Sequence, residues 1–207
     1  MIATLPGRLI QVFFIFLWTF SMTARSETLM VWGDSLSAAY NIPVEQGWVS
    51  LLQQRLNQRD GNAWQVVNGS ISGEISGGGL TRLPDALKRD TPTLFILGLG
   101  SNDGLQGKPL PLLKNNLQAM IDQAKGQGAQ VLLLGNKIPP NYGAAYANGF
   151  EKVYADIAAE KAIPLVPFLL DGVATDFDLM QSDGLHPTMA AQALILENVW
   201  PHLEPML

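Results

Sequence analysis

The 207-residue sequence contains no cysteine and only two histidines. Without cysteine the chain has no disulfide, no thiolate nucleophile, no Cys-ligated zinc and no lipid-modified cysteine. Positive charge is also scarce, because 13 Lys and Arg stand against 18 Asp and Glu, for a net charge of −5. Nucleic-acid binding needs clustered basic residues, so we expect no nucleic-acid partner. The stability of the protein must come from its apolar core alone.

Only one long hydrophobic run is present, at residues 9–20, and it is shorter than the ~20 residues that span a bilayer. Arg8 precedes this run, and Ala24-Arg25-Ser26 has the small-x-small pattern of a cleavage site. The sequence therefore predicts a signal peptide over residues 1–26 and a periplasmic or secreted domain over 27–207. An uncleaved anchor is the alternative, and the length of the run disfavours it. After cleavage we expect a monomer with no stable membrane anchor.

The remaining composition, 47% hydrophobic and 15% charged, is that of one globular domain. Apolar runs alternate with segments of helical periodicity, separated by glycine and polar stretches. The pattern predicts strands at 28–33, 64–68, 93–99, 130–134 and 164–166, helices at 48–59, 80–89, 110–125, 146–161 and 188–202, and a glycine-rich loop at 69–79. Such alternation predicts an α/β fold with a parallel sheet covered on both faces. With five strands, we expect a flavodoxin-like three-layer α/β/α arrangement with strand order 2-1-3-4-5.

The first predicted strand ends at Gly33-Asp34-Ser35-Leu36. In such sheets the carboxyl ends of the strands are where ligands bind. Taken alone, Ser35 has the residue type of a helix N-cap. It is a nucleophile only if the chain also supplies a base, an orienting acid and an oxyanion site.

His186 is the histidine that fits a base. Asp183 precedes it by three residues, so a carboxylate in the same loop can accept a hydrogen bond from one ring nitrogen and leave the other free to take a proton. The alternatives are a simple loop ion pair and an Asp183 side chain that only accepts a hydrogen bond from a turn N–H group. His202 lies near the end of the last predicted helix, and we interpret it as a surface residue.

Gly73 and Asn102 lie after the second and third predicted strands. Glycine lets the backbone approach a ligand closely, and the Asn amide is a neutral donor, as an oxyanion site requires. Both residues also suit ordinary turns.

Taken in order, these segments resemble the four sequence blocks of the SGNH (GDSL) hydrolase family. The blocks are Gly33-Asp34-Ser35-Leu36-Ser37, Gly73, Gly100-Ser101-Asn102-Asp103 and Asp183-Gly184-Leu185-His186-Pro187. Further segments resemble the exported bacterial thioesterase, lysophospholipase and arylesterase branch of that family, and together they cover essentially the whole of 27–207. These are 68–74, 102–105, 138–143 and 164–168. Ser101 is a departure, because this branch often has glycine there.

The resemblance implies hydrolysis of carboxylic esters or thioesters through an acyl-enzyme, with no cofactor and no metal. Ser35 is then the nucleophile, His186 the base and Asp183 its orienting acid. The backbone N–H groups of Ser35 and Gly73 and the Asn102 side chain form the oxyanion hole. A mobile lip over the acyl chain is expected at 75–80. Expected acyl-chain contacts, each equally compatible with core packing, are Ile75, Leu80, Leu105, Pro140 and Tyr142.

Two alternatives remain at the level of the sequence. Other branches of the family deacetylate carbohydrates. A non-catalytic flavodoxin-like module is also compatible with the sequence, with Asp34, Asp103 and Asp183 holding a hard cation.

Overall fold

The protein was described from a computed structural model, which covers Met1 and residues 26–60 and 63–207. The proposed signal peptide therefore lies almost entirely outside the described residues. Within these ranges, no helix is both long and apolar enough to cross a membrane.

Five parallel strands form one sheet in the order β2-β1-β3-β4-β5, which confirms the predicted topology. Their bounds are β1 Glu27–Gly33, β2 Trp64–Asn68, β3 Leu94–Gly98, β4 Gln130–Leu134 and β5 Leu165–Val166. The helices are α1 Trp48–Asp60, α2 Ser76–Asp90, α3 Ser101–Leu105, α4 Leu110–Gly126, α5 Ala144–Lys161 and α6 Gln192–Leu203. The short helix α3 was not predicted.

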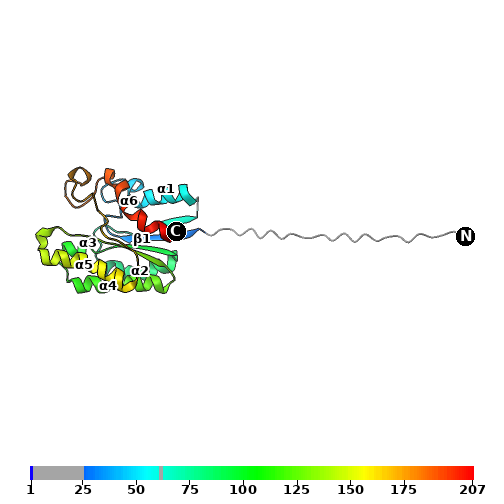
Figure 1. Ribbon diagram of the computed structural model, residues 1–207, viewed down its shortest axis with the longest axis horizontal. Coiled ribbons are helices and arrows are strands. Elements are labelled where there is room, and N and C mark those ends of the chain that lie inside the picture. Colours follow the sequence, from blue (N-terminus) through cyan, green and yellow to red (C-terminus); the bar gives the residue numbers. More distant parts are fainter. Residues whose placement is uncertain (2–25, 61–62) are drawn as a thin grey trace.

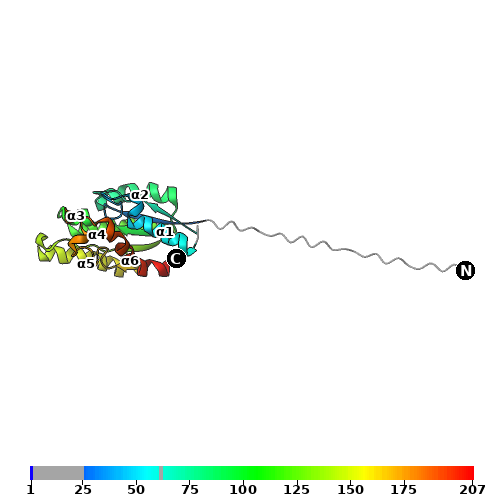
Figure 2. The same cartoon turned by 90° about the horizontal axis from the view of Figure 1, so that it is seen from above.

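The central strands are apolar throughout because both faces of the sheet are covered. Leu94 and Ile96 of β3 pack with α1 and α6, whereas Phe95 and Leu97 pack with α2, α4 and α5. Figure 1 shows these two helical layers on opposite sides of the sheet. In Figure 2, α3 lies at the end of the molecule opposite the C-terminus. That end carries the carboxyl ends of the strands.

The predicted loop is wrong for residues 76–79, which form the first turn of α2, while the mobility expected of 75–80 stays a prediction. Both oxygens of the buried Asp103 carboxylate hold this turn, because they accept the Ser76 N–H at 2.7 Å and the Ser76 hydroxyl at 2.6 Å. Gly79 is closely packed, since a Cβ there would lie 2.3 Å from Leu99 Cδ1 and would displace that side chain. Gly79 therefore serves helix packing, and Pro84 lies in the interior of α2.

The last predicted helix also begins later than expected. Thr188 precedes a 3₁₀ turn at Met189–Ala191, and its side chain makes no capping hydrogen bond. Gln192, the first residue of α6, instead donates to the Thr188 carbonyl at 3.1 Å and accepts the Trp48 N–H at 3.0 Å. One buried amide thus links the start of α6 to the start of α1.

Asp103→Ala should lower the free energy of unfolding by roughly 3 kcal/mol, because it leaves the buried N–H and hydroxyl of Ser76 without their charged acceptor. Urea denaturation followed by circular dichroism measures the loss. The matched control is Asp122→Ala, which removes an exposed ion pair with Lys161 and should change stability by less than ~1 kcal/mol. Equal losses in the two variants would contradict the anchoring role of Asp103.

Candidate active site

The turn after β1 is fixed by the buried Asp34. This side chain is 0% exposed, and its Oδ1 accepts the Leu36 N–H at 3.1 Å. Gly33 is needed at the end of the strand because a Cβ there would lie 2.9 Å from Ser37 Oγ and 3.2 Å from the Gly98 carbonyl oxygen. The turn leaves Ser35 beside the loop that carries the histidine.

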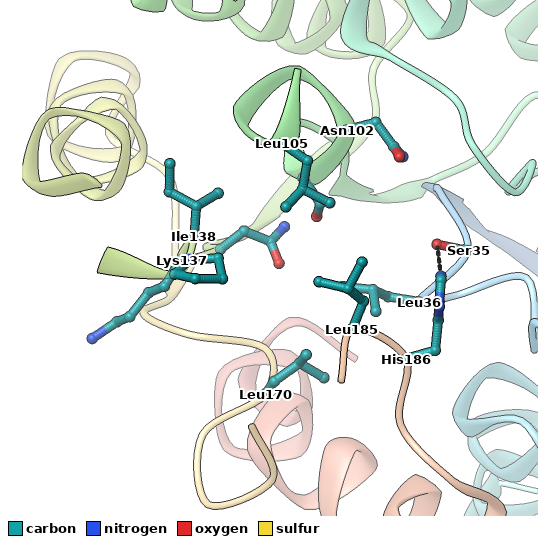
Figure 3. Close-up of a pocket in the computed structure, with 12 residues that line it drawn as sticks. Ser35, Leu36, Asn102, Leu105, Lys137, Ile138, Leu170, Leu185 and His186 are labelled. Atoms are coloured by element: carbon teal, nitrogen blue, oxygen red, sulfur yellow. Dashed lines mark hydrogen bonds between the residues drawn. The ribbon is translucent and has the colours of Figure 1, made fainter. Parts of the chain in front are cut away.

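Ser35, His186 and Asp183 form one continuous hydrogen-bonded chain. His186 Nε2 lies 2.9 Å from Ser35 Oγ, and His186 Nδ1 lies 2.7 Å from Asp183 Oδ2. Figure 3 shows the imidazole and the Ser35 hydroxyl facing each other at one side of the pocket. The residues that the sequence separates by 151 positions are therefore in direct contact.

The second oxygen of Asp183 is held by the backbone. Oδ1 accepts the N–H groups of Leu185 at 2.9 Å and His186 at 3.0 Å. Partial burial opposes ionisation of this carboxyl, but the hydrogen bonds from the His186 ring and from the two backbone N–H groups lower its pKa to about 2. An ionised Asp183 only accepts hydrogen bonds, so Nδ1 of the neutral imidazole carries the proton and Nε2 is left to accept the hydroxyl of Ser35.

Two residues that the sequence analysis did not select hold the histidine loop against the turn after β1. Gln181 Nε2 donates to the carbonyls of Tyr40 at 3.0 Å and Pro187 at 2.9 Å. The ring of Tyr40 packs on the imidazole of His186 with centroids 4.2 Å apart. Neither residue belongs to a recognisable motif, and their pairing joins segments about 140 residues apart, so no local signal marks them.

Gly73 and Asn102 reach the same region. Gly73 has φ of +78°, a conformation that favours glycine. Asn102, in the unpredicted α3, donates from Nδ2 to the Glu74 carbonyl at 3.0 Å. One amide hydrogen is thus fixed on the Gly73–Glu74 segment, and the second stays available. Within the described part of the chain, the N–H groups of Ser35 and Gly73 donate no hydrogen bond.

A cavity of about 140 Å³ opens beside Ser35 and His186 (Figure 3). Its apolar wall is formed by Leu36, Leu105, Ile138, Pro139, Leu170 and Leu185, and its polar lining by Ser35, Ser101, Asn102, Asn136, Lys137 and His186. In Figure 3 the Lys137 side chain points away from the cavity. Asn136–Pro139 begin two residues after the end of β4. Because ligands bind at the carboxyl ends of strands in such sheets, this position predicts that they lie near the site.

Of the expected acyl-chain contacts, Leu105 lines this cavity, whereas Ile75, Leu80 and Tyr142 do not. Leu80 packs against the core between the sheet and α2, α4 and α5. Tyr142 is 40% exposed on a 3₁₀ turn, and Ile75 precedes α2 outside the cavity. The side chain of Pro140 lies outside the described part of the structure.

The three carboxylates of the cation alternative do not converge. Asp103 is bound to Ser76, Asp34 is buried in its turn, and Asp183 is bound to His186. Within residues 26–60 and 63–207, no three His, Asp or Glu side chains form a group able to hold a metal ion. These contacts disfavour a cation-binding module.

Comparison with known proteins gives the family. The model of the GDSL-like lipase/acylhydrolase family matches residues 31–194, which include Ser35, Gly73, Asn102, Asp183 and His186. The chain belongs to this family. It is therefore a serine hydrolase of the SGNH (GDSL) type, acting on ester or thioester bonds.

Individual relatives agree with this assignment. The chain is 50% identical over 184 residues to esterase TesA of Pseudomonas aeruginosa, covering 89% of this chain and 91% of that protein. It is 36% identical over 194 residues to thioesterase 1/protease 1/lysophospholipase L1 of Escherichia coli K12, covering 94% and 91%. A crystal structure of TesA superposes with a TM-score of 0.85 at 50% identity, over 87% of this chain and all of that one.

Proposed function

We propose that this SGNH hydrolase cleaves short acyl esters and thioesters through an acyl-enzyme on Ser35. The observation that supports this most directly is the Ser35–His186–Asp183 chain opening into a largely apolar cavity. The nucleophile and its base lie 2.9 Å apart, within the range expected for proton transfer. The cavity provides a place for the acyl group next to the hydroxyl.

In the first step, Ser35 Oγ attacks the substrate carbonyl while His186 Nε2 takes the hydroxyl proton. Asp183 keeps the imidazole in the required tautomer and stabilises its positive charge. His186 then gives the proton to the departing alcohol or thiol. In the second step, His186 takes a proton from a water molecule, and the water oxygen attacks the acyl-enzyme. The bond between the acyl carbon and Ser35 Oγ then breaks as His186 returns the proton to Oγ, which releases the acid and restores the free serine.

Negative charge on the carbonyl oxygen is stabilised by the N–H groups of Ser35 and Gly73 and by Asn102 Nδ2. The bond from Asn102 to the Glu74 carbonyl orients the amide before substrate arrives. Preorganised donors of this kind require no rearrangement during the reaction.

The size of the cavity supports short acyl groups. An apolar cavity of roughly 150 Å³ accommodates benzene, so about 140 Å³ suits about six non-hydrogen atoms. In this proposal the acyl group of the substrate contacts the residues that line the cavity, and the leaving group extends out of it. The cavity then limits the length of the acyl chain but not the leaving group, which can be an aryl alcohol, a glyceryl alcohol or a thiol.

Labelling with a fluorophosphonate, followed by peptide mass spectrometry, tests the proposed nucleophile. The expected result is one adduct on Ser35, undiminished by EDTA. A kcat/KM series over p-nitrophenyl esters from C2 to C16 tests the acyl length and should peak near C4–C6. Absence of the Ser35 adduct, or faster release of acetate from acetylated sugars than from any of these esters, would contradict the proposal.

Asn102→Ala should lower kcat by about 10²-fold with little change in KM, because it removes a donor that acts on charge present only in the transition state. Steady-state kinetics on p-nitrophenyl butyrate measures the effect. Asn57→Ala, on the exposed face of α1, is the matched control and should keep the parent kcat. A change in KM alone at Asn102 would point to a contact with bound substrate instead.

We also propose that residues 1–26 are removed on export and that residues 27–207 act as a monomer. Intact-mass measurement of the secreted or periplasmic protein, with light scattering, checks both points. A mature N-terminus at Glu27 is expected.

A further inference from the structure

Tyr40 contacts both the nucleophile and its base, and the hydrolytic steps leave it without a role. Its backbone N–H donates to the Ser35 carbonyl at 3.3 Å. Its ring lies on the imidazole of His186, with centroids 4.2 Å apart and planes tilted by 33°. Tyr40 is 45% exposed, so burial in the apolar core does not account for its position. An aromatic ring held against the base therefore needs another explanation.

The backbone on both sides of Tyr40 has an unusual conformation. Ala39 has φ of +58° and Asn41 has φ of +56°, in the left-handed region that L side chains rarely adopt. Among the described residues, the other non-glycine positions with positive φ are Thr91 and Ala162, which end helices, where this conformation is common. Away from a helix end, such a conformation persists only where surrounding contacts impose it, and it is concentrated at functional sites.

Contacts from distant segments hold this turn. Ala39 packs on Gly47, where a Cβ would lie 2.8 Å from Ala39 Cβ. Gln181, in the histidine loop, accepts a hydrogen bond from Asn41 Nδ2 at 3.0 Å and donates to the Tyr40 carbonyl at 3.0 Å. The residues on both sides of Tyr40 are therefore fixed, and the ring keeps its place on the imidazole.

The ring supplies a contact that the hydrogen bonds of His186 do not. Nδ1 binds Asp183 and Nε2 binds Ser35, and both bonds lie in the plane of the imidazole. They set the tautomer, but neither limits rotation of the imidazole about the line that joins them. The Tyr40 ring lies against a face of the imidazole and limits that rotation. Since the face of an aromatic ring carries partial negative charge, it also attracts the cation that His186 becomes when it takes a proton.

We propose that Tyr40 is a positioning residue for His186, whose ring face keeps the imidazole turned toward Ser35 and stabilises the imidazolium that forms in each step. The strained turn at 39–41 and its bonds to Gln181 hold the ring in place for this purpose. This inference rests on the proposed acyl-enzyme at Ser35. In this role Tyr40 acts on the imidazole and not on the substrate, so its contribution is the same for every leaving group.

The test measures kcat and KM of Tyr40→Leu on two esters with the same acyl group, p-nitrophenyl butyrate by absorbance and ethyl butyrate by pH-stat titration. Leucine keeps an apolar contact but has no aromatic face, so kcat should fall about fivefold on both esters while KM stays nearly unchanged. Tyr40→Phe keeps the ring face and should retain kcat within about twofold of the parent. Phe177→Leu is the matched control, because it removes a ring that is 94% exposed, and it should keep both constants at the parent values.

A loss confined to the p-nitrophenyl ester would mean that the ring contacts the aryl leaving group, and it would overturn the positioning role. Parent kcat in Tyr40→Leu would overturn that role as well. So would an equal loss in Tyr40→Phe and Tyr40→Leu, which would assign the effect to the hydroxyl. Tyr40→Leu should still take one fluorophosphonate on Ser35, more slowly than the parent, which also shows that the variant is folded. A parent protein that takes no adduct would instead overturn the proposed nucleophile.

Discussion

Ser35→Ala should reduce kcat/KM for p-nitrophenyl hexanoate by at least ~10⁴-fold, which is the largest effect expected of any single substitution in this protein. The variant retains the oxyanion donors and the cavity, but it has no oxygen to bond to the acyl carbon. Direct attack by water on the bound ester is the only remaining route. The thermal midpoint should change little, because Ser35 Oγ makes one partly buried hydrogen bond, to His186. Spectrophotometric release of p-nitrophenol and a circular dichroism melt measure the two quantities.

Ser37→Ala is the matched control for this variant. Ser37 lies in the same turn, is 2% exposed and has a hydroxyl without a hydrogen bond within the described residues. Its removal makes the same chemical change two residues away and should leave kcat/KM within about threefold of the parent. If Ser35→Ala hydrolysed the ester at the parent rate, the nucleophile would have to be another group.

The strands and their order follow from the sequence because their signals are local. Residues 64–68 and 130–134 are short apolar runs with polar or glycine neighbours, and both predicted ranges agree with β2 and β4. The apolar runs of the central strands need cover on both faces, and the helical segments between them provide it. That alternation predicts a parallel five-stranded sheet, and the order 2-1-3-4-5, expected by analogy with flavodoxin-like folds, is confirmed.

The start of α2 was not predictable from local propensity. Ser76-Gly77-Gly78-Gly79 has a loop composition, and glycine disfavours helix by about 1 kcal/mol per residue. The acceptor that holds this turn is Asp103, 27 residues later in the chain. The close neighbour of Gly79 is the side chain of Leu99, the residue that follows β3. Tertiary contacts thus override a local preference.

The candidate site likewise contains residues that the sequence predicts and residues that only the packing of distant segments brings in. Ser35, Gly73, Asn102 and His186 follow strand ends or carry a family block, so their proximity was expected from topology. The contacts of Gln181 and Tyr40 with the histidine loop, and of Asn136 with the cavity, depend on packing between distant segments. Strand-end position alone marks the region around Asn136, but it does not tell which of the residues there line the cavity.

Asp183→Asn should lower kcat by roughly 10³–10⁴-fold while the fold stays intact. The two backbone N–H groups that bind Asp183 Oδ1 should hold the oxygen of the new amide, which turns its NH₂ toward His186 Nδ1. An NH₂ group donates, so Nδ1 must accept, and the ring proton moves to Nε2. Nε2 then cannot take the proton of Ser35. The variant also lacks the negative charge that stabilises the imidazolium.

The low pKa of Asp183 adds a second, independent readout. A carboxyl whose pKa falls to about 2 on folding stabilises the native state above its unfolded value near 4, and this contribution is lost as the pH falls toward 2. The difference in thermal midpoint between parent and Asp183→Asn should therefore shrink as the pH falls from about 4 to 2.

Asp178→Asn, on an exposed 3₁₀ turn near the same loop, is the matched control and should keep the parent kcat. Retention of activity within tenfold in Asp183→Asn would mean that other contacts orient the imidazole. The ring of Tyr40 and the Gln181 bridge are the contacts that remain in that variant. Neither contact supplies a negative charge. A large loss of kcat in Asp183→Asn, in a variant that keeps both contacts, would therefore mean that the carboxylate acts through its charge and through the tautomer of His186. Packing of the imidazole ring alone would then not explain the role of Asp183.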